Sequence, residues 1–146
     1  MKDARTRNPI VWVHTIGQAS PGAATISARD LALGVPLLLN SGSGALGWWQ
    51  LRQTDLRTLT TGQELHQAYR LHNLQVAVKE QELSQLFAYL QGHHLQPLLG
   101  NGWAIARHYP EPGLRPYGDF ELYVPRAQYA LYQLVLQRPE ARGWSA

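Results

Sequence analysis

A chain of 146 residues can bury one hydrophobic core, so we expect a single domain over residues 1–146. Its formal net charge of +3 favours contact with phosphates but is too small to require nucleic acid as a partner. Cysteine is absent, which excludes disulfide frameworks and thiolate metal sites and leaves oxygen and imidazole groups as the available metal ligands.

The apolar runs of the N-terminal half are short. Ile10 to Val13 form a run of four residues, too short for the hydrophobic centre of a secretory signal. The later run over residues 31–39 is interrupted by Gly34 and Pro36 and falls far short of the roughly 20 residues of a membrane helix. We therefore expect a soluble, cytoplasmic protein with no membrane partner, which fits the lack of cysteine.

Residues 1–61 form a partly irregular N-terminal segment in this interpretation. Residues 17–47 are rich in Gly, Ser, Pro and Ala, which is typical of loops. One short helix is expected there, capped by Thr25 or Ser27 and ending near Leu33.

A long amphipathic helix is predicted over residues 62–93, because apolar side chains recur there at intervals of three, four and seven residues. Trp48, Trp49 and Leu51 indicate a preceding helix that packs against it. The alternative is that the tryptophan pair is exposed on a binding surface.

Residues 95–146 form the motif-bearing part of the chain, where proline and glycine separate short elements. The pattern predicts, in order, a buried strand over 95–99, a helix capped by Asn101 and ended by Pro110, a strand over 119–124 and a helix over 126–137. The fold class is therefore α+β, with a helical N-terminal half followed by a small sheet with flanking helices.

Asp119 and Glu121 lie one residue apart in the second predicted strand, so their carboxylates share one face. Two convergent carboxylates repel each other unless a cation compensates, and Mg²⁺ binds through one or two carboxylates together with substrate phosphates. The alternative is a solvated acidic face on an edge strand. Asn101 and Gly102 stand at a helix start, where backbone amides can hold a phosphate beside such a metal.

The stretch from Pro97 to Pro125, "PLLGNGWAIARHYPEPGLRPYGDFELYVP", resembles the core motif of the bacterial uncharacterised nucleotidyltransferase family. This family lies within the DNA polymerase beta-like nucleotidyltransferase superfamily. Gly102 matches the family's glycine, Gly113 to Arg115 its turn, and Asp119 its first metal-binding carboxylate. Glu121 stands where the family usually has Asp.

The resemblance implies a set of functional residues. Asp119 and Glu121 are expected to be catalytic and to bind Mg²⁺ or Mn²⁺. Residues Asn101, Gly102 and Arg115 are expected to bind a nucleoside triphosphate. The acceptor of the nucleotidyl group stays unknown.

Two departures from the family pattern bear on activity. Asn101 stands where the family has Lys, which removes a cation expected to face phosphate. Superfamily members also use a third carboxylate on a later strand, whereas only Glu140 follows Glu121 here, in a stretch typical of a loop. The chain thus resembles the N-terminal part of a longer enzyme, as a fragment, a natural truncation or a degenerate member.

Two hypotheses follow, and whether the chain is an enzyme is left open between them. The first is metal-dependent transfer of a nucleotidyl group to an acceptor hydroxyl. The second is a non-catalytic remnant of the fold that binds a partner or nucleic acid through its basic and aromatic surface. A sheet that stops early leaves an unpaired edge, so we expect a homodimer or the Gly/Ser-rich segment to cover it.

Overall fold

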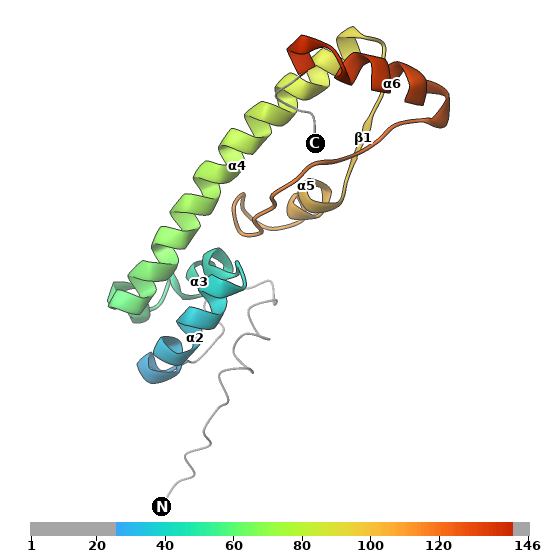
Figure 1. The fold of residues 1–146 in the computed structure, drawn as a ribbon. Helices are drawn as coiled ribbons and strands as arrows, with labels where there is room; N and C mark the ends of the chain where they lie inside the picture. Colours follow the sequence, from blue (N-terminus) through green and yellow to red (C-terminus); the bar gives the residue numbers. More distant parts are fainter. Residues whose placement is uncertain (1–25, 142–146) are drawn as a thin grey trace, which may run out of the picture. The chain divides into compact units, whose positions relative to one another are not determined.

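The computed structural model describes residues 26–141 and shows an α+β fold with a helical N-terminal half, as predicted (Figure 1). Its helices and strands are α2 (Ala28–Asn40), α3 (Gly44–Leu51), α4 (Thr60–Gly92), β1 (Leu98–Gly100), α5 (Asn101–Ala106), β2 (Glu121–Tyr123) and α6 (Tyr129–Leu136). Short 3₁₀ turns cover Asp55–Thr58, Arg126–Gln128 and Pro139–Ala141. Within residues 26–141, no helix is long and apolar enough to cross a membrane.

The chain forms two compact units, which we describe separately. In the described part, the first unit contains residues 26–75 and 109–116, and the second unit contains residues 76–108 and 117–141. Helix α4 contributes residues to both units. The motif from Pro97 to Pro125 is divided as well: its turn, Gly113 to Arg115, belongs to the first unit, and its carboxylates, Asp119 and Glu121, belong to the second.

Helix α2 is longer than predicted. Ser27 caps it, since its hydroxyl accepts a hydrogen bond from the backbone N–H of Asp30 at 3.1 Å; the alternative cap, Thr25, lies outside the described residues. The helix does not end near Leu33 but continues through Pro36 to Asn40. A proline inside a helix removes one hydrogen bond and normally disfavours it. Here the burial of four residues of α2, namely Leu31, Gly34, Val35 and Leu38, offsets the lost hydrogen bond.

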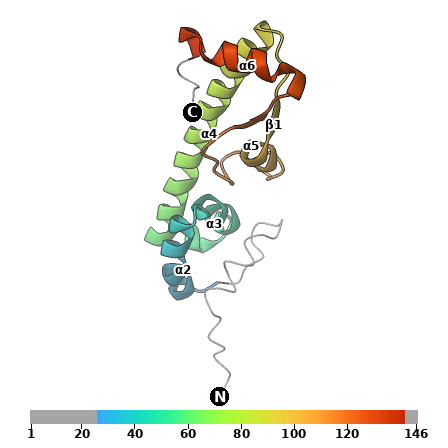
Figure 2. The same cartoon turned by 45° about the vertical axis from the view of Figure 1, so that its right-hand side comes forward.

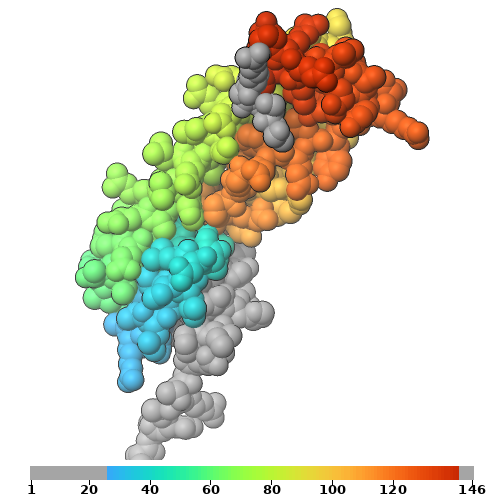
Figure 3. All heavy atoms as spheres, in the orientation of Figure 1, coloured from blue at the N-terminus to red at the C-terminus, as the bar shows by residue number. Residues whose placement is uncertain are grey.

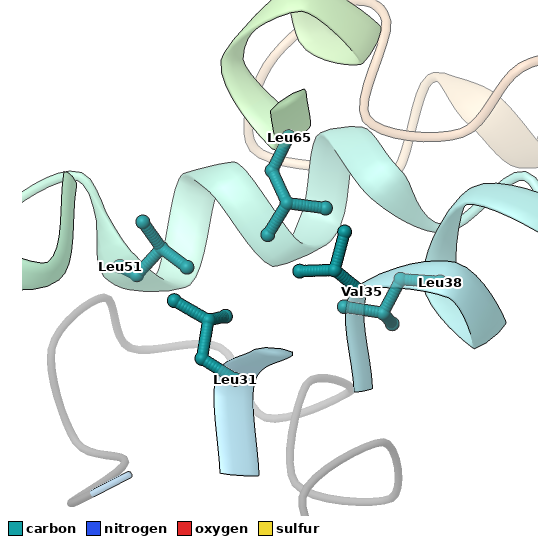
Figure 4. Packing of buried hydrophobic residues seen from close by; sticks show 5 residues of the cluster. All are labelled: Leu31, Val35, Leu38, Leu51 and Leu65. Carbon is teal, nitrogen blue, oxygen red and sulfur yellow. The ribbon is translucent and has the colours of Figure 1, made fainter. Parts of the chain in front are cut away.

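The main core of the first unit joins α2, α3 and α4. Five buried side chains form it, namely Leu31, Val35, Leu38, Leu51 and Leu65 (Figure 4). Gly47 of α3 permits this packing, because a Cβ at that position would lie 2.9 Å from Leu38 Cδ1 and 3.1 Å from Leu65 Cδ1. Buried apolar area of this kind is the largest favourable contribution to folding.

The tryptophan pair packs against the long helix, which confirms that prediction. Trp49 is 5% exposed and clusters with Ala45 and Leu114. Trp48 stacks on His66 of α4, with ring centroids 4.2 Å apart. The long helix itself, α4, matches the predicted range closely.

The second unit holds the two-stranded antiparallel sheet and α6. Leu98 pairs with Tyr123, Leu99 with Leu122 and Gly100 with Glu121. Helix α6 lies across the carboxyl-terminal end of α4 (Figure 1 and Figure 2), where its Val135 joins a core of Leu86, Leu90 and Leu95. In the space-filling view, the red and orange atoms of α6 and of the segment before it lie together (Figure 3).

Both predicted strands exist, but they are shorter than expected. Leu98 is 70% exposed, so the prediction of a buried first strand, which was based on its apolar residues, is wrong. The second strand begins at Glu121, so Asp119 precedes it in an irregular segment. A two-stranded ribbon has few neighbours to prolong its ladder, and its strands accordingly stop after three residues each.

Candidate functional site

The candidate site lies in the second unit, where β1 passes directly into α5. Gly100 is the last residue of the strand and Asn101 the first of the helix. Asn101 has a φ of 52°, in the left-handed region that asparagine tolerates better than most residues. The predicted capping role of Asn101 is wrong, because α5 has no side-chain cap and its N-cap position is Gly100. The helix also ends at Ala106, well before Pro110.

The side chain of Asn101 instead binds the predicted metal ligand Glu121. Its Nδ2 donates to Glu121 Oε1 at 2.6 Å, and the Tyr123 hydroxyl donates to Glu121 Oε2 at 3.2 Å. The ladder makes this contact possible, since Glu121 pairs with Gly100, the residue before Asn101. Both carboxylate oxygens of Glu121 are therefore held by neighbouring donors.

Gly102 lies against the segment that carries Asp119. A Cβ at Gly102 would lie 3.0 Å from Tyr117 Cβ and 3.6 Å from the carbonyl oxygen of Asp119. Any larger residue would therefore push this segment away from the start of α5. The structure thus brings Asn101, Gly102, Asp119 and Glu121 together, and the residues Asp119 and Glu121 are both exposed.

The remaining predicted nucleotide contact, Arg115, belongs to the first unit. Arg115 lies two residues after Gly113, whose φ of 79° is in the left-handed region. A Cβ at Gly113 would lie 2.8 Å from Asn73 Cγ and 2.9 Å from the Asn73 backbone nitrogen, so the turn is pressed against α4. A nucleotide-binding role for Arg115 stays a prediction.

A charged network holds this turn in the first unit, and no sequence pattern predicted it. Arg52 donates to Glu111 at 2.8 to 2.9 Å, and the Tyr69 hydroxyl donates to Glu111 Oε2 at 2.9 Å. The Arg52 guanidinium also lies 5.7 Å from the Trp49 ring centroid. These residues are far apart in sequence, so no local pattern connects them.

The network shifts the pKa values of its members. Burial favours the neutral form of Glu111, but the hydrogen bonds from Arg52 and Tyr69 outweigh it and lower the pKa of Glu111 below its ordinary 4.5. Burial, and then the hydrogen bond to Glu111, raises the pKa of the Tyr69 hydroxyl. Glu111 is therefore held as a carboxylate, and the turn is fastened through a charge-assisted contact.

The carboxylates of Asp119 and Glu121 could hold a metal ion only together with ligands from a substrate or water. Over residues 26–141, no group of three His, Asp or Glu side chains is placed to hold a metal ion. Two exposed carboxylates suit Mg²⁺ or Mn²⁺ where substrate phosphates and water complete the coordination. Each carboxylate oxygen of Glu121 accepts one hydrogen bond, from Asn101 or from Tyr123, and keeps a second lone pair that can bind a metal ion.

Comparison with known proteins identified a protein family. The model of a family described as uncharacterised nucleotidyltransferase matches residues 47–146, which is more than half of the chain. No curated protein and no solved structure matched.

Proposed function

The chain belongs to this uncharacterised nucleotidyltransferase family, and we propose that it transfers a nucleotidyl group from a nucleoside triphosphate to an acceptor hydroxyl, using Mg²⁺ or Mn²⁺. The observation that carries the proposal is the junction of β1 and α5, where Gly102 contacts the segment of Asp119 and Asn101 binds Glu121. The segment that carries the two exposed carboxylates thereby lies against the start of α5.

Each residue has a distinct role in this proposal. Asp119 and Glu121 hold the metal, which when bound neutralises charge on the triphosphate. Asn101 orients the carboxylate of Glu121, and Gly102 leaves room for the segment of Asp119. The protein's contribution is positioning and electrostatic stabilisation.

Thermal melting with and without metal tests the carboxylate pair. Millimolar Mn²⁺, alone and with each ribonucleoside triphosphate, should raise the melting temperature of the wild-type chain, because a ligand that binds only the folded state stabilises it. The double variant Asp119→Asn, Glu121→Gln should lose this response. The matched control, Asp55→Asn with Glu140→Gln, removes two exposed carboxylates elsewhere and should keep it. A wild-type melting curve that Mn²⁺ leaves unchanged would sink the metal site.

A second candidate function is a non-catalytic binding module with the same fold. The observation that favours it is that Asn101 and Tyr123 already engage both oxygens of Glu121. The absence of a third suitably placed acidic group within residues 26–141 points the same way. Release of pyrophosphate from a nucleoside triphosphate, measured with a panel of hydroxyl-bearing acceptors, separates the two functions. Binding of the metal and nucleotide without pyrophosphate release would favour the module.

A further inference from the structure

Glu121 shares one face of the two-stranded ribbon with Tyr123. Side chains alternate between the two faces of a strand, so Glu121 and Tyr123 point to one face and Leu122 points to the other. Leu122 packs against the apolar cluster under α6, which leaves the face of Glu121 and Tyr123 outward. Tyr123, which is 58% exposed, therefore lies beside the proposed metal ligand and not in the core.

A glycine on the neighbouring strand gives the Tyr123 ring its position. Gly100 pairs with Glu121, and a Cβ at Gly100 would overlap Tyr123 Cε2 and lie 3.0 Å from Tyr123 Cδ2. The ring thus covers the space that a side chain at position 100 would fill. The φ of Gly100 is −118°, which any residue can adopt. The glycine is therefore required by the tyrosine ring and not by the backbone conformation.

From this position the Tyr123 hydroxyl reaches the carboxylate of Glu121. It donates to Oε2 at 3.2 Å, while Asn101 Nδ2 donates to Oε1 at 2.6 Å. A free glutamate side chain samples several rotamers, and fixing one of them costs conformational entropy. One donor at each oxygen fixes the orientation before a metal ion arrives and leaves a lone pair on each oxygen for that ion. Hydrogen-bond partners of metal-binding carboxylates act in this way.

We infer that Tyr123 is a positioning residue: together with Asn101 it holds Glu121 in the orientation that binds Mg²⁺ or Mn²⁺, and Gly100 admits its ring. The hydroxyl acts through Glu121 and is not itself a metal ligand. The inference rests on the proposed function, which supplies the metal. The orientation of Glu121 is also a property of the metal-free chain, so it can be measured separately.

Tyr123→Phe removes the hydroxyl and keeps the ring over Gly100. In calorimetric titrations of the full chain with Mn²⁺ and inorganic tripolyphosphate, this variant should bind about three- to tenfold more weakly than the wild type, because the lost partner of the metal ligand is an exposed one. The urea midpoint without metal should stay unchanged, which a purely structural role would not predict. Tyr129→Phe, on α6 and also 58% exposed, is the matched control and should change neither quantity.

Two further variants test whether Tyr123 acts through Glu121. In a Glu121→Ala background, Tyr123→Phe should not weaken binding of Mn²⁺ and tripolyphosphate any further, because the group that it orients is gone. Gly100→Ala should displace the ring and weaken binding at least as much as Tyr123→Phe does. An effect of Tyr123→Phe that persists in the Glu121→Ala background would overturn the inference.

Three-bond NMR couplings about the Cα–Cβ and Cβ–Cγ bonds of Glu121 report its orientation without metal. They should indicate one rotamer in the wild type and an average over several in Tyr123→Phe. If the wild type binds Mn²⁺ and tripolyphosphate but Tyr123→Phe matches it in both measurements, the inference is overturned and the proposed function stands. If the couplings depend on Tyr123 but Mn²⁺ does not bind, the positioning of Glu121 stands and the proposed function fails.

Discussion

The first and second units use their polar and charged side chains differently. In the first unit, Arg52 and Tyr69 both donate hydrogen bonds to Glu111 and fasten a turn beside two buried apolar clusters. In the second unit, Asp119 and Glu121 are exposed, and an apolar cluster of Leu86, Leu90, Leu95 and Val135 lies under α6. The charges of the Glu111 network therefore serve stability, whereas the exposed carboxylates of the second unit are the ones that we propose bind a ligand. Substitutions in the two units should separate these effects.

The largest loss of stability is expected from Leu65→Ala. Leu65 is fully buried between α2 and α3, so truncation removes apolar contacts and leaves a cavity, at a cost of about 3–4 kcal/mol. Leu74→Ala, on the same helix but 64% exposed, is the control and should cost less than about 0.5 kcal/mol. Urea unfolding followed by circular dichroism measures both. Equal losses would contradict the packing of the first unit.

A smaller loss is expected from Gly113→Ala. The left-handed φ alone disfavours a residue with a Cβ by about 1–2 kcal/mol, and the clash with Asn73 adds to it, so we expect about 2–3 kcal/mol in total. Gly92→Ala, at the end of α4 with open space around it, should be neutral or stabilising by up to about 1 kcal/mol. Chemical unfolding of both variants gives the comparison, and a neutral Gly113→Ala would refute the described turn.

Glu111→Gln tests the charged network through pH. The pKa of Glu111 is lowered in the folded chain, so its contribution to stability is present above pH 4.5 and is lost as pH falls through the lowered value. We expect a cost of about 1–2 kcal/mol at pH 7, the range of a hydrogen bond to a charged group at a partly exposed site. The difference from wild type should shrink toward pH 3. Glu64→Gln, at an exposed position of α4, should show neither effect.

The smallest effect on stability is expected at the candidate site itself. Without metal, Asp119→Asn should change the free energy of unfolding by less than about 0.5 kcal/mol, because the side chain is exposed. The variant should still reduce the response to Mn²⁺. A loss above about 1 kcal/mol in metal-free unfolding experiments would mean that Asp119 has a structural role.

Periodicity in the sequence was sufficient for the long helix α4 but not for α2. The apolar positions of α4 predict a long helix, and the prediction holds because the same face is buried at Leu65, Leu83, Leu86 and Leu90. The predicted end of α2 near Leu33 was wrong, because a stretch rich in Gly, Ser, Pro and Ala indicates a loop, whereas the buried face of the helix continues through Pro36 to Asn40. Tertiary packing decides such cases, and it cannot be read from neighbouring residues.

Most of the residues that come together at the junction of β1 and α5 were predicted from the sequence, but their contacts were not, and their functional roles stay predictions. The spacing of Asp119 and Glu121, and the glycine at position 102, identified the group that the structure assembles. The hydrogen bond from Asn101 to Glu121 depends on the strand register, and the link from Arg52 to Glu111 on packing across 59 residues. Neither has a local sequence signal, so only the folded arrangement reveals them.

Because the backbone of Asn101 is left-handed, a substitution that adds a charge at this position also changes how well the residue fits the backbone conformation. A lysine there, as the resemblance would place, brings a cation but favours other backbone angles, and it also gives up the amide contact with Glu121. Glycine would keep the angle and remove only the amide. An engineer who wishes to strengthen phosphate binding is therefore better served by a cation placed on a neighbouring residue, with Asn101 left to shape the junction.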